Sequence, residues 1–123
     1  MNPAPFEATV AQLDDEVRAI VVRGELDLST ASELEGPLEE AISAKDASVL
    51  IDLSDCEFID STGIALIVRA WQRLDRTADG EGEGRVVICS DNDQVRRVLE
   101  ITGLELSIAI YSTRDEALAV LRG

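Results

Sequence analysis

The sequence predicts an α/β domain. We expect a mixed sheet of about five strands, with an N-terminal antiparallel hairpin, the remaining strands parallel, and about four helices mainly on one face. Short apolar segments alternate with longer segments of helical periodicity, in the order β-β-α-β-α-β-α-β-α. Repeated βα units require parallel strands joined by right-handed crossovers. Only a short polar link separates the first two strands, which favours a hairpin.

Length and composition indicate one domain and exclude several functions. The 123 residues suit a single domain at 6–123 after a flexible N-terminus at 1–5, and 46% of them are hydrophobic, enough for a packed core. A formal charge of −14 disfavours nucleic acids and anionic membranes, because phosphate contacts need Lys and Arg. The absence of His excludes catalysis by His and metal ligation by His. Without a signal peptide or a long apolar run, we expect a soluble, cytoplasmic protein.

The first half of the chain predicts two strands and a helix. Strands are expected at 6–13 and 17–23, with a polar turn at 14–16, and Gly24 should end the second strand. A loop then leads to a helix, where Thr30 and Glu33 have the spacing of a capping box. Pro37 conflicts with a continuous helix, so this helix is either kinked or regular only from about Pro37.

The second half predicts three further βα units. In the strand at 48–53, Val49, Ile51 and Leu53 should share one face, with Leu50 and Asp52 on the other. A helix at 60–76, an acidic Gly-rich loop at 78–84 and a strand at 85–90 follow. Either Asp91 or Asp93 should cap the next helix, which Gly103 ends. The last strand is expected at 106–111, and a capping box at 113–116 starts the final helix. Cys56 and Cys89 should be buried free thiols.

Chemistry should gather at the carboxyl ends of the parallel strands, where two segments, 24–30 and 56–64, would meet if their strands are neighbours. In the second segment, Asp60 and Ser61 lie at a helix N-terminus, where free N–H groups and the helix dipole favour negative charge. A phosphate on Ser61, close to Asp27, could therefore switch binding off without disturbing the fold. The alternative is that these residues only cap helices or form turns. Leu28 and Leu66 could face a partner or pack in the core.

The run from Val49 to Leu66, VLIDLSDCEFIDSTGIAL, resembles the signature of the STAS family of anti-sigma factor antagonists. Gly24-Glu25-Leu26-Asp27 resembles the other landmark of that family. The resemblance implies that Ser61 is phosphorylated by a cognate anti-sigma factor that is also a serine kinase. It further implies that the unphosphorylated protein binds this kinase and frees the sigma factor. The expected partner-binding residues are Asp27, Leu28, Ser29, Thr30, Asp60, Thr62, Gly63 and Ile64.

No cofactor is implied for this chain, because ATP and Mg²⁺ would belong to the kinase. The oligomeric state stays open, and we expect a monomer that forms a heterocomplex. A response-regulator receiver would need a Lys after its last strand, but the only Lys is Lys45, between the first helix and the next strand. A Mg²⁺ enzyme is suggested only by a cluster of acids that is better interpreted as solvated loop residues, namely Asp52, Asp55, Glu57 and Asp60. A STAS scaffold or transporter-associated module without kinase control stays open.

Overall fold

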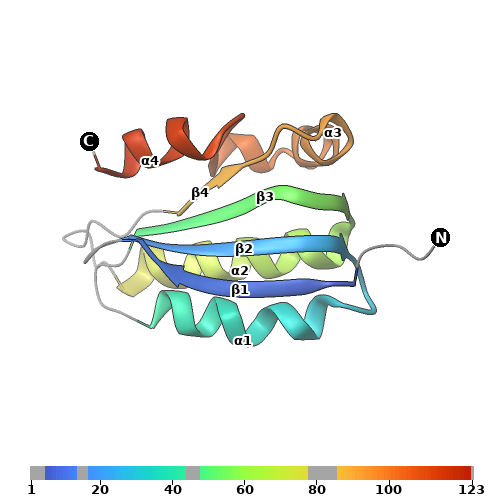
Figure 1. Ribbon diagram of the computed structural model, residues 1–123, viewed down its shortest axis with the longest axis horizontal. Coiled ribbons are helices and arrows are strands. Elements are labelled where there is room, and N and C mark those ends of the chain that lie inside the picture. The colour runs from blue at the N-terminus through green and yellow to red at the C-terminus, as the bar shows by residue number, and fades with distance from the viewer. Residues whose placement is uncertain (1–4, 14–16, 44–47, 78–85, 123) are drawn as a thin grey trace.

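The computed structural model describes residues 5–13, 17–43, 48–77 and 86–122, and the side chains of these except 74–77. The polar turn at 14–16, Lys45, the Gly-rich loop and most of the N-terminal segment lie outside this part. Ten elements follow one another along the chain (Figure 1): β1 (Glu7–Gln12), β2 (Val17–Leu26), α1 (Ala31–Ile42), β3 (Ser48–Ile59), α2 (Ser61–Thr77), β4 (Val86–Cys89), α3 (Asp93–Ile101), the 3₁₀ helix η1 (Leu104–Leu106), β5 (Ala109–Tyr111) and α4 (Arg114–Arg122).

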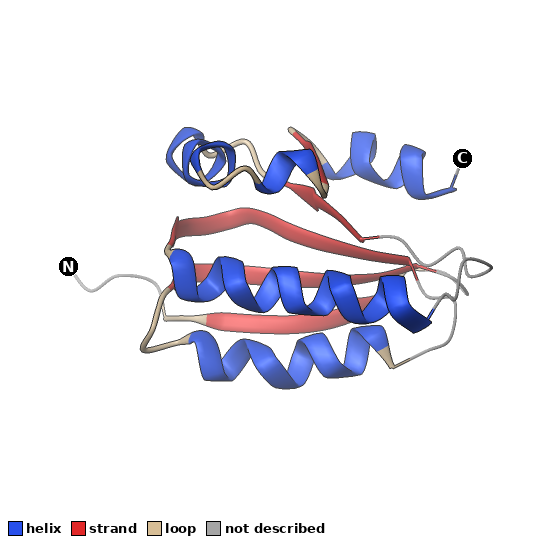
Figure 2. Ribbon diagram, turned by 180° about the vertical axis from the view of Figure 1, so that it is seen from behind, coloured by secondary structure: helices blue, strands red, loops and turns tan. Residues whose placement is uncertain are grey.

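The sheet has the predicted mixed topology. Its strand order is β1-β2-β3-β4-β5, with β1 antiparallel to β2 and every other pair parallel. Helices α1 and α2 lie side by side over one face (Figure 2), and α3 adds Val95 and Leu99 to the same core. Among the described helices, α4 alone packs on the opposite face, through Ala117. The predicted fold class is therefore confirmed, with α4 as the exception to the single helical face.

The core is aliphatic, and the strand side chains alternate between two unequal faces. In β3, Val49, Ile51 and Leu53 enter the large core beneath α1 and α2, whereas Leu50 packs under α4, as the alternation predicted. Cys56 and Cys89 are free and buried, one on each side of the sheet. Burial raises the pKa of the Cys89 thiol to about 12, so this thiol stays protonated and acts as a small apolar residue.

The second strand continues past Gly24, so the prediction that Gly24 ends it is wrong. β2 runs on to Leu26, and the pairing with β3 shifts by one residue between Gly24 and Glu25. Gly24 has φ of 85°, a left-handed conformation that costs glycine little. The residue without a partner at this shift is Glu57, so the bulge lies in β3, opposite Gly24, and the two strands stay paired for two more residues.

The structure excludes one of the two alternatives for the first helix and contradicts its predicted capping box. α1 is one helix from Ala31 that includes Pro37, so its regular part does not begin near Pro37. Thr30 holds the N-cap position but makes no capping hydrogen bond, because its hydroxyl donates to the Glu25 carbonyl at 2.8 Å and accepts from the Asp27 N–H at 2.9 Å. The expected capping box is thus replaced by bonds that fold the preceding loop.

The C-terminal third differs from its prediction at the cap of α3 and at the start of the last strand. α3 is capped by Asn92, whose side chain accepts from the N–H groups of Gln94 and Val95, rather than by Asp91 or Asp93. As predicted, Gly103 follows the end of α3, and its φ is 77°. The 3₁₀ helix η1 begins at the next residue. The last strand therefore begins only at Ala109, because Leu104 turns back into the core before the chain can extend.

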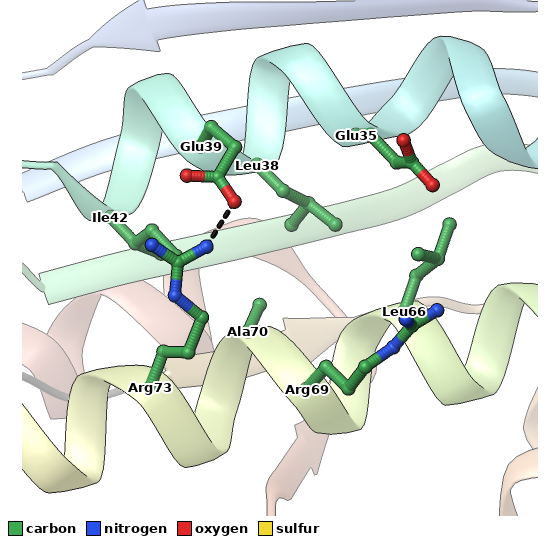
Figure 3. Close-up of a pocket in the computed structure, with 8 residues that line it drawn as sticks. All are labelled: Glu35, Leu38, Glu39, Ile42, Leu66, Arg69, Ala70 and Arg73. Atoms are coloured by element: carbon green, nitrogen blue, oxygen red, sulfur yellow. Dashed lines mark hydrogen bonds and ion pairs between the residues drawn. The ribbon is translucent and has the colours of Figure 1, made fainter.

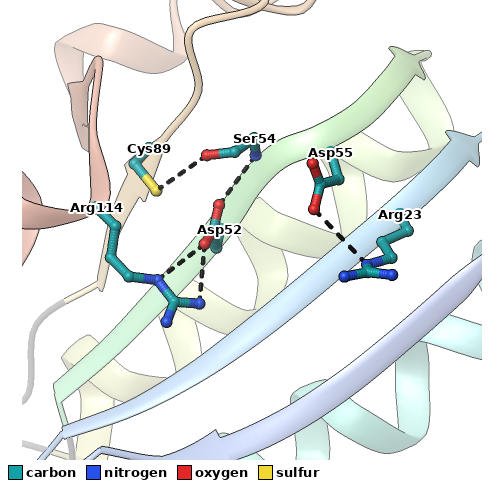
Figure 4. A network of polar contacts seen from close by, with 6 residues as sticks. All are labelled: Arg23, Asp52, Ser54, Asp55, Cys89 and Arg114. Atoms are coloured by element: carbon teal, nitrogen blue, oxygen red, sulfur yellow. Dashed lines mark hydrogen bonds and ion pairs between the residues drawn. The ribbon is translucent and has the colours of Figure 1, made fainter.

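An ion pair between a buried carboxylate and a half-buried guanidinium group fastens α4 to the sheet (Figure 4). Asp52 of β3 lies under α4 and accepts from Arg114 Nε at 3.0 Å and from Nη2 at 2.9 Å. Burial raises the pKa of Asp52, but hydrogen bonds from Ser54, Cys89 and Arg114 outweigh it, so that the pKa lies below its ordinary value of 3.8. The expectation that Asp52 is a solvated loop acid is therefore wrong.

Replacing Asp52 with Asn should lower the free energy of unfolding by about 1–3 kcal/mol at pH 7, because Arg114 loses its charged acceptor. The lowered pKa stabilises the fold fully above the unfolded pKa of about 3.9, and this contribution disappears as pH falls through the folded pKa. Urea unfolding at pH 7 and at pH 3 should therefore show that the difference between wild type and variant shrinks in acid.

Asp55→Asn is the matched control for Asp52→Asn. Asp55 lies 3.6 Å from Arg23 (Figure 4), with both side chains about 60% exposed. Its loss should change the free energy of unfolding by less than about 1 kcal/mol. Equal effects of the two variants would contradict a special role for the Asp52–Arg114 pair.

Candidate functional site

The two polar segments singled out in the sequence lie against each other at the carboxyl edge of the sheet. β2 and β3 are parallel neighbours that end in register, with Leu26 opposite Ile59. The next residue, Asp60, donates its N–H to the Leu26 carbonyl at 3.1 Å. α1 and α2 begin just beyond these strand ends, so their N-termini flank one surface.

Asp60 connects the two segments through its side chain. Its Oδ1 atom accepts from the N–H groups of Thr62 at 2.9 Å and Gly63 at 3.2 Å, which caps α2. Its Oδ2 atom accepts from the N–H of Leu28 at 3.2 Å. The helix cap expected for Asp60 is present, and the same carboxylate also holds the loop before α1.

Asp27 organises that loop. Its Oδ1 atom accepts from the Ser29 hydroxyl at 2.6 Å and from the N–H groups of Ser29 at 2.9 Å and Thr30 at 3.2 Å. These bonds, above all the one from the Ser29 hydroxyl, outweigh the effect of burial and lower the pKa of Asp27. Asp27 is therefore an anion at neutral pH, fixed close to the start of α2.

Ser61 is exposed at the first position of α2, and its hydroxyl makes no hydrogen bond within the described residues. Leu28 is 78% exposed and lines a shallow hollow of about 440 Å³ with Asp27, Ser29 and Asp60. The edge therefore presents a free hydroxyl and an apolar side chain within a ring of polar groups.

Two of the predicted partner-binding residues lie beneath this surface. Gly63 and Ile64 are both buried, and Ile64 belongs to the large core. Thr62 is half-buried. Leu66 is also buried, so of its two open interpretations the structure supports core packing. Exposure could not be read from the sequence, because the helical period of apolar residues is the same for a core face and a docking face.

Gly63 lets α2 approach β2 closely. A Cβ atom at this position would lie 2.6 Å from Leu26 Cγ, 2.8 Å from its Cδ2 atom and 3.2 Å from Ile59 Cγ1. Both neighbours are fully buried side chains that cannot move aside. The absence of a side chain at Gly63 therefore fixes how closely the start of α2 packs on the ends of the two strands.

A groove between α1 and α2 was not predicted from the sequence (Figure 3). Its volume is about 320 Å³, and Leu38, Leu66 and Ala70 form its apolar floor. Glu35 and Glu39 line it from α1, and Arg69 and Arg73 line it from α2. An ion pair between Glu39 and Arg73 crosses the groove and links the two helices.

The described residues hold no arrangement of three or more carboxylates and thiols suited to a metal ion. Asp52 faces α4, Asp55 faces Arg23, and Asp60 bonds to backbone amides, so the acids that are close in sequence point to different partners. Among the described helices, none combines the length and the apolar composition that a bilayer span requires.

Comparison with known proteins identifies the family. A model of the STAS domain family matches residues 8–117. The chain belongs to the STAS family. This membership confirms the resemblance that the segments around Asp27 and Ser61 carried in the sequence.

Named relatives cover almost the whole chain. The anti-sigma-F factor antagonist RsfB of Mycobacterium tuberculosis is 27% identical over 121 residues, covering 98% of this STAS chain and 94% of the relative. The anti-sigma-B factor antagonist of Listeria monocytogenes is 32% identical over 108 residues, covering 87% and 90%. The crystal structure of an anti-sigma factor antagonist from Mycobacterium paratuberculosis has a TM-score of 0.84 at 28% identity, covering 97% and 96%.

Removing the Ser29 hydroxyl should raise the pKa of Asp27 towards its ordinary value of 3.8, because the shortest hydrogen bond to the carboxylate is lost. An NMR titration of the side-chain carboxyl carbons in Ser29→Ala measures this shift. Ser43→Ala, which removes a hydroxyl at the other end of α1, should leave the titration of Asp27 unchanged. An unaltered Asp27 midpoint in Ser29→Ala would contradict the assignment.

Adding a methyl group at Gly63 should destabilise the fold by about 1–3 kcal/mol, because the start of α2 would be pushed away from Leu26. Gly36→Ala is the control, since a Cβ there meets nothing within 4 Å. Its gain in helix propensity is opposed by the restriction from the following Pro37, so stability should change by less than about 1 kcal/mol. Equal unfolding midpoints in urea for the two variants would contradict the close packing of the start of α2 on Leu26.

Proposed function

We propose that this STAS protein is an anti-sigma factor antagonist whose binding is controlled by phosphorylation of Ser61. The observation that carries the proposal is the position of Ser61, an exposed hydroxyl at the start of α2, beside the loop that Asp27 and Asp60 hold. The names of the relatives that cover the chain support the antagonist role.

In the proposed cycle the unphosphorylated protein binds an anti-sigma factor that is also a serine kinase, and the sigma factor is released. The contact surface consists of the exposed groups around Ser61, with Gly63 and Ile64 shaping it from below. It comprises Asp27, Leu28, Ser29, Thr30, Asp60, Thr62, Gly63 and Ile64. Such a protein acts by binding rather than by catalysis.

A phosphate on Ser61 would block binding while leaving the fold intact. It adds about −1.5 to −2 charges close to two carboxylates, those of Asp27 and Asp60. The N-terminus of α2 tolerates this charge, because its dipole and free N–H groups favour anions. A partner surface that covers Ser61 would have to strip water from the phosphate, which is far costlier than covering a hydroxyl. Binding is therefore lost without a change in the backbone.

The proposal needs no cofactor on this chain. The kinase partner supplies the ATP and Mg²⁺ for the transfer to Ser61. The antagonist would be a monomer until it meets its partner, and it would work in the cytoplasm, where sigma factors meet RNA polymerase. Its excess negative charge would act mainly on the rate of encounter with a partner.

The test compares wild type with Ser61→Ala and Ser61→Asp in binding to purified candidate anti-sigma kinases from the same genome. Wild type and Ser61→Ala should bind, and Ser61→Asp should bind at least about tenfold more weakly, because the added charge mimics part of the phosphate. Intact mass after addition of ATP should show one phosphate on wild type and none on Ser61→Ala.

Thr62→Ala is the control for the phosphorylation site, because Thr62 is the neighbouring hydroxyl and is half-buried. It should still gain one phosphate. If all the variants bind alike and no phosphate appears, Ser61 is only the first residue of a helix. The protein would then be a STAS binding module without kinase control.

A further inference from the structure

Leu28 is an exposed apolar side chain at the candidate site, and the backbone of its loop is hydrogen-bonded throughout. The N–H groups of residues 27–31 all donate hydrogen bonds: Asp27 to Thr30 Oγ1, Leu28 to Asp60 Oδ2, Ser29 and Thr30 to Asp27 Oδ1, and Ala31 to the Asp27 carbonyl. A leucine that is 78% exposed therefore projects from a loop whose shape is set before a partner arrives.

A rigidly presented leucine is suited to binding. Covering its apolar surface is favourable, and a loop that is already ordered loses little conformational freedom on association. The groups that share its hollow, Asp27, Ser29 and Asp60, are polar. One apolar side chain within a polar ring matches the anatomy of interface hot spots, in which a buried anchor is surrounded by a polar rim.

We infer that Leu28 is the apolar anchor that enters a dry pocket on the anti-sigma partner, and that Asp60 is the positioning residue that holds the anchor in place. The inference rests on the proposed function and specifies how its surface works. Asp60 bonds the Leu28 N–H with Oδ2 and caps α2 with Oδ1. One carboxylate thus fixes the anchor relative to the helix that begins with Ser61.

This arrangement explains why a phosphate on Ser61 is an effective block. Ser61 follows Asp60 directly in the chain, and the Asp60 carboxylate touches the backbone of Leu28. A pocket that closes over Leu28 must therefore also exclude water from the start of α2. An uncharged hydroxyl can be covered in this way. A phosphate with about −1.5 to −2 charges remains strongly hydrated and prevents the pocket from closing over Leu28.

The anchor is tested by Leu28→Ala against Leu106→Ala. Leu106 is the matched control, because it is a leucine that is 87% exposed and lies on η1, which follows α3 rather than the site. Leu28→Ala should weaken binding to the purified anti-sigma kinase at least about tenfold, and Leu106→Ala should change it by less than about twofold. Urea unfolding of both variants should match wild type, since neither side chain is buried. Equal affinities of the two variants would overturn the anchor role.

The positioning role is tested by Asp60→Asn in a double-mutant cycle with Leu28→Ala. The Asn carbonyl can still cap α2, but its amide group cannot accept the Leu28 N–H. Asp60→Asn alone should weaken binding about fivefold, and it should weaken it little further when Leu28→Ala is already present. Losses that multiply fully would show that Asp60 acts independently of Leu28 and would overturn its role as a positioning residue.

A measurement on the free protein separates this inference from the proposed function. In Asp60→Asn, amide hydrogen exchange at Leu28 should become faster, while exchange at Thr62 and Gly63 should stay as in wild type, because the cap is kept. If wild type binds no anti-sigma kinase, the proposed function and the anchor role fail together. Exchange at Leu28 still decides whether Asp60 holds the loop, and an unchanged rate would overturn that part.

Discussion

The parallel pairing of β2 with β3 is the constraint on which the rest of this structure depends. Two parallel neighbours end at the same edge of a sheet, so the chain segments that leave them emerge side by side. Here the pairing continues to the last residues of both strands, Leu26 and Ile59, and one more hydrogen bond joins Asp60 to Leu26 beyond it. Segments that are 32 residues apart in the chain thereby share hydrogen bonds.

Two local features let this pairing reach so far. The pairing shifts register twice, between Val21 and Arg23 and between Gly24 and Glu25, and the extra residue lies in β3 each time. Gly63 then allows α2 to start directly against Leu26. The bulges in β3 and the glycine at the start of α2 act through backbone geometry, and together they place Ser61 at the edge where β2 also ends.

The two faces of the sheet are covered in different ways. The face under α1, α2 and α3 is purely apolar in its centre, and burial of aliphatic side chains holds it together. The face under α4 is smaller, and it includes the buried carboxylate of Asp52, which is satisfied by Arg114 and by the Ser54 N–H. A short helix with few apolar contacts gains orientation from such a pair, because two guanidinium nitrogens, Nε and Nη2, both contact the Asp52 Oδ2 atom.

Much of the fold could be predicted from local patterns. The alternation of apolar residues in β3 correctly separated Val49, Ile51 and Leu53 from Leu50, because the period of two in a strand is a property of the backbone. The order of strands and helices predicted the mixed sheet, because the connections between elements limit how the strands can pair. Details that depend on competing partners were not predicted: Asn92 rather than a neighbouring Asp caps α3, and the hydroxyl of Thr30 folds a loop instead of capping α1.

The sequence by itself determined the order of strands and helices, the family and the identity of the groups at the sheet edge. It determined these because periodicity, chain connectivity and motif spacing are local properties of the chain. Only the tertiary structure decided that Leu28 is exposed while Ile64 and Leu66 are buried, and that Asp60 bonds the loop that carries Leu28. Those outcomes depend on which surfaces pack together across a distance of many residues, and a leucine has the same local pattern whether a helix covers it or not.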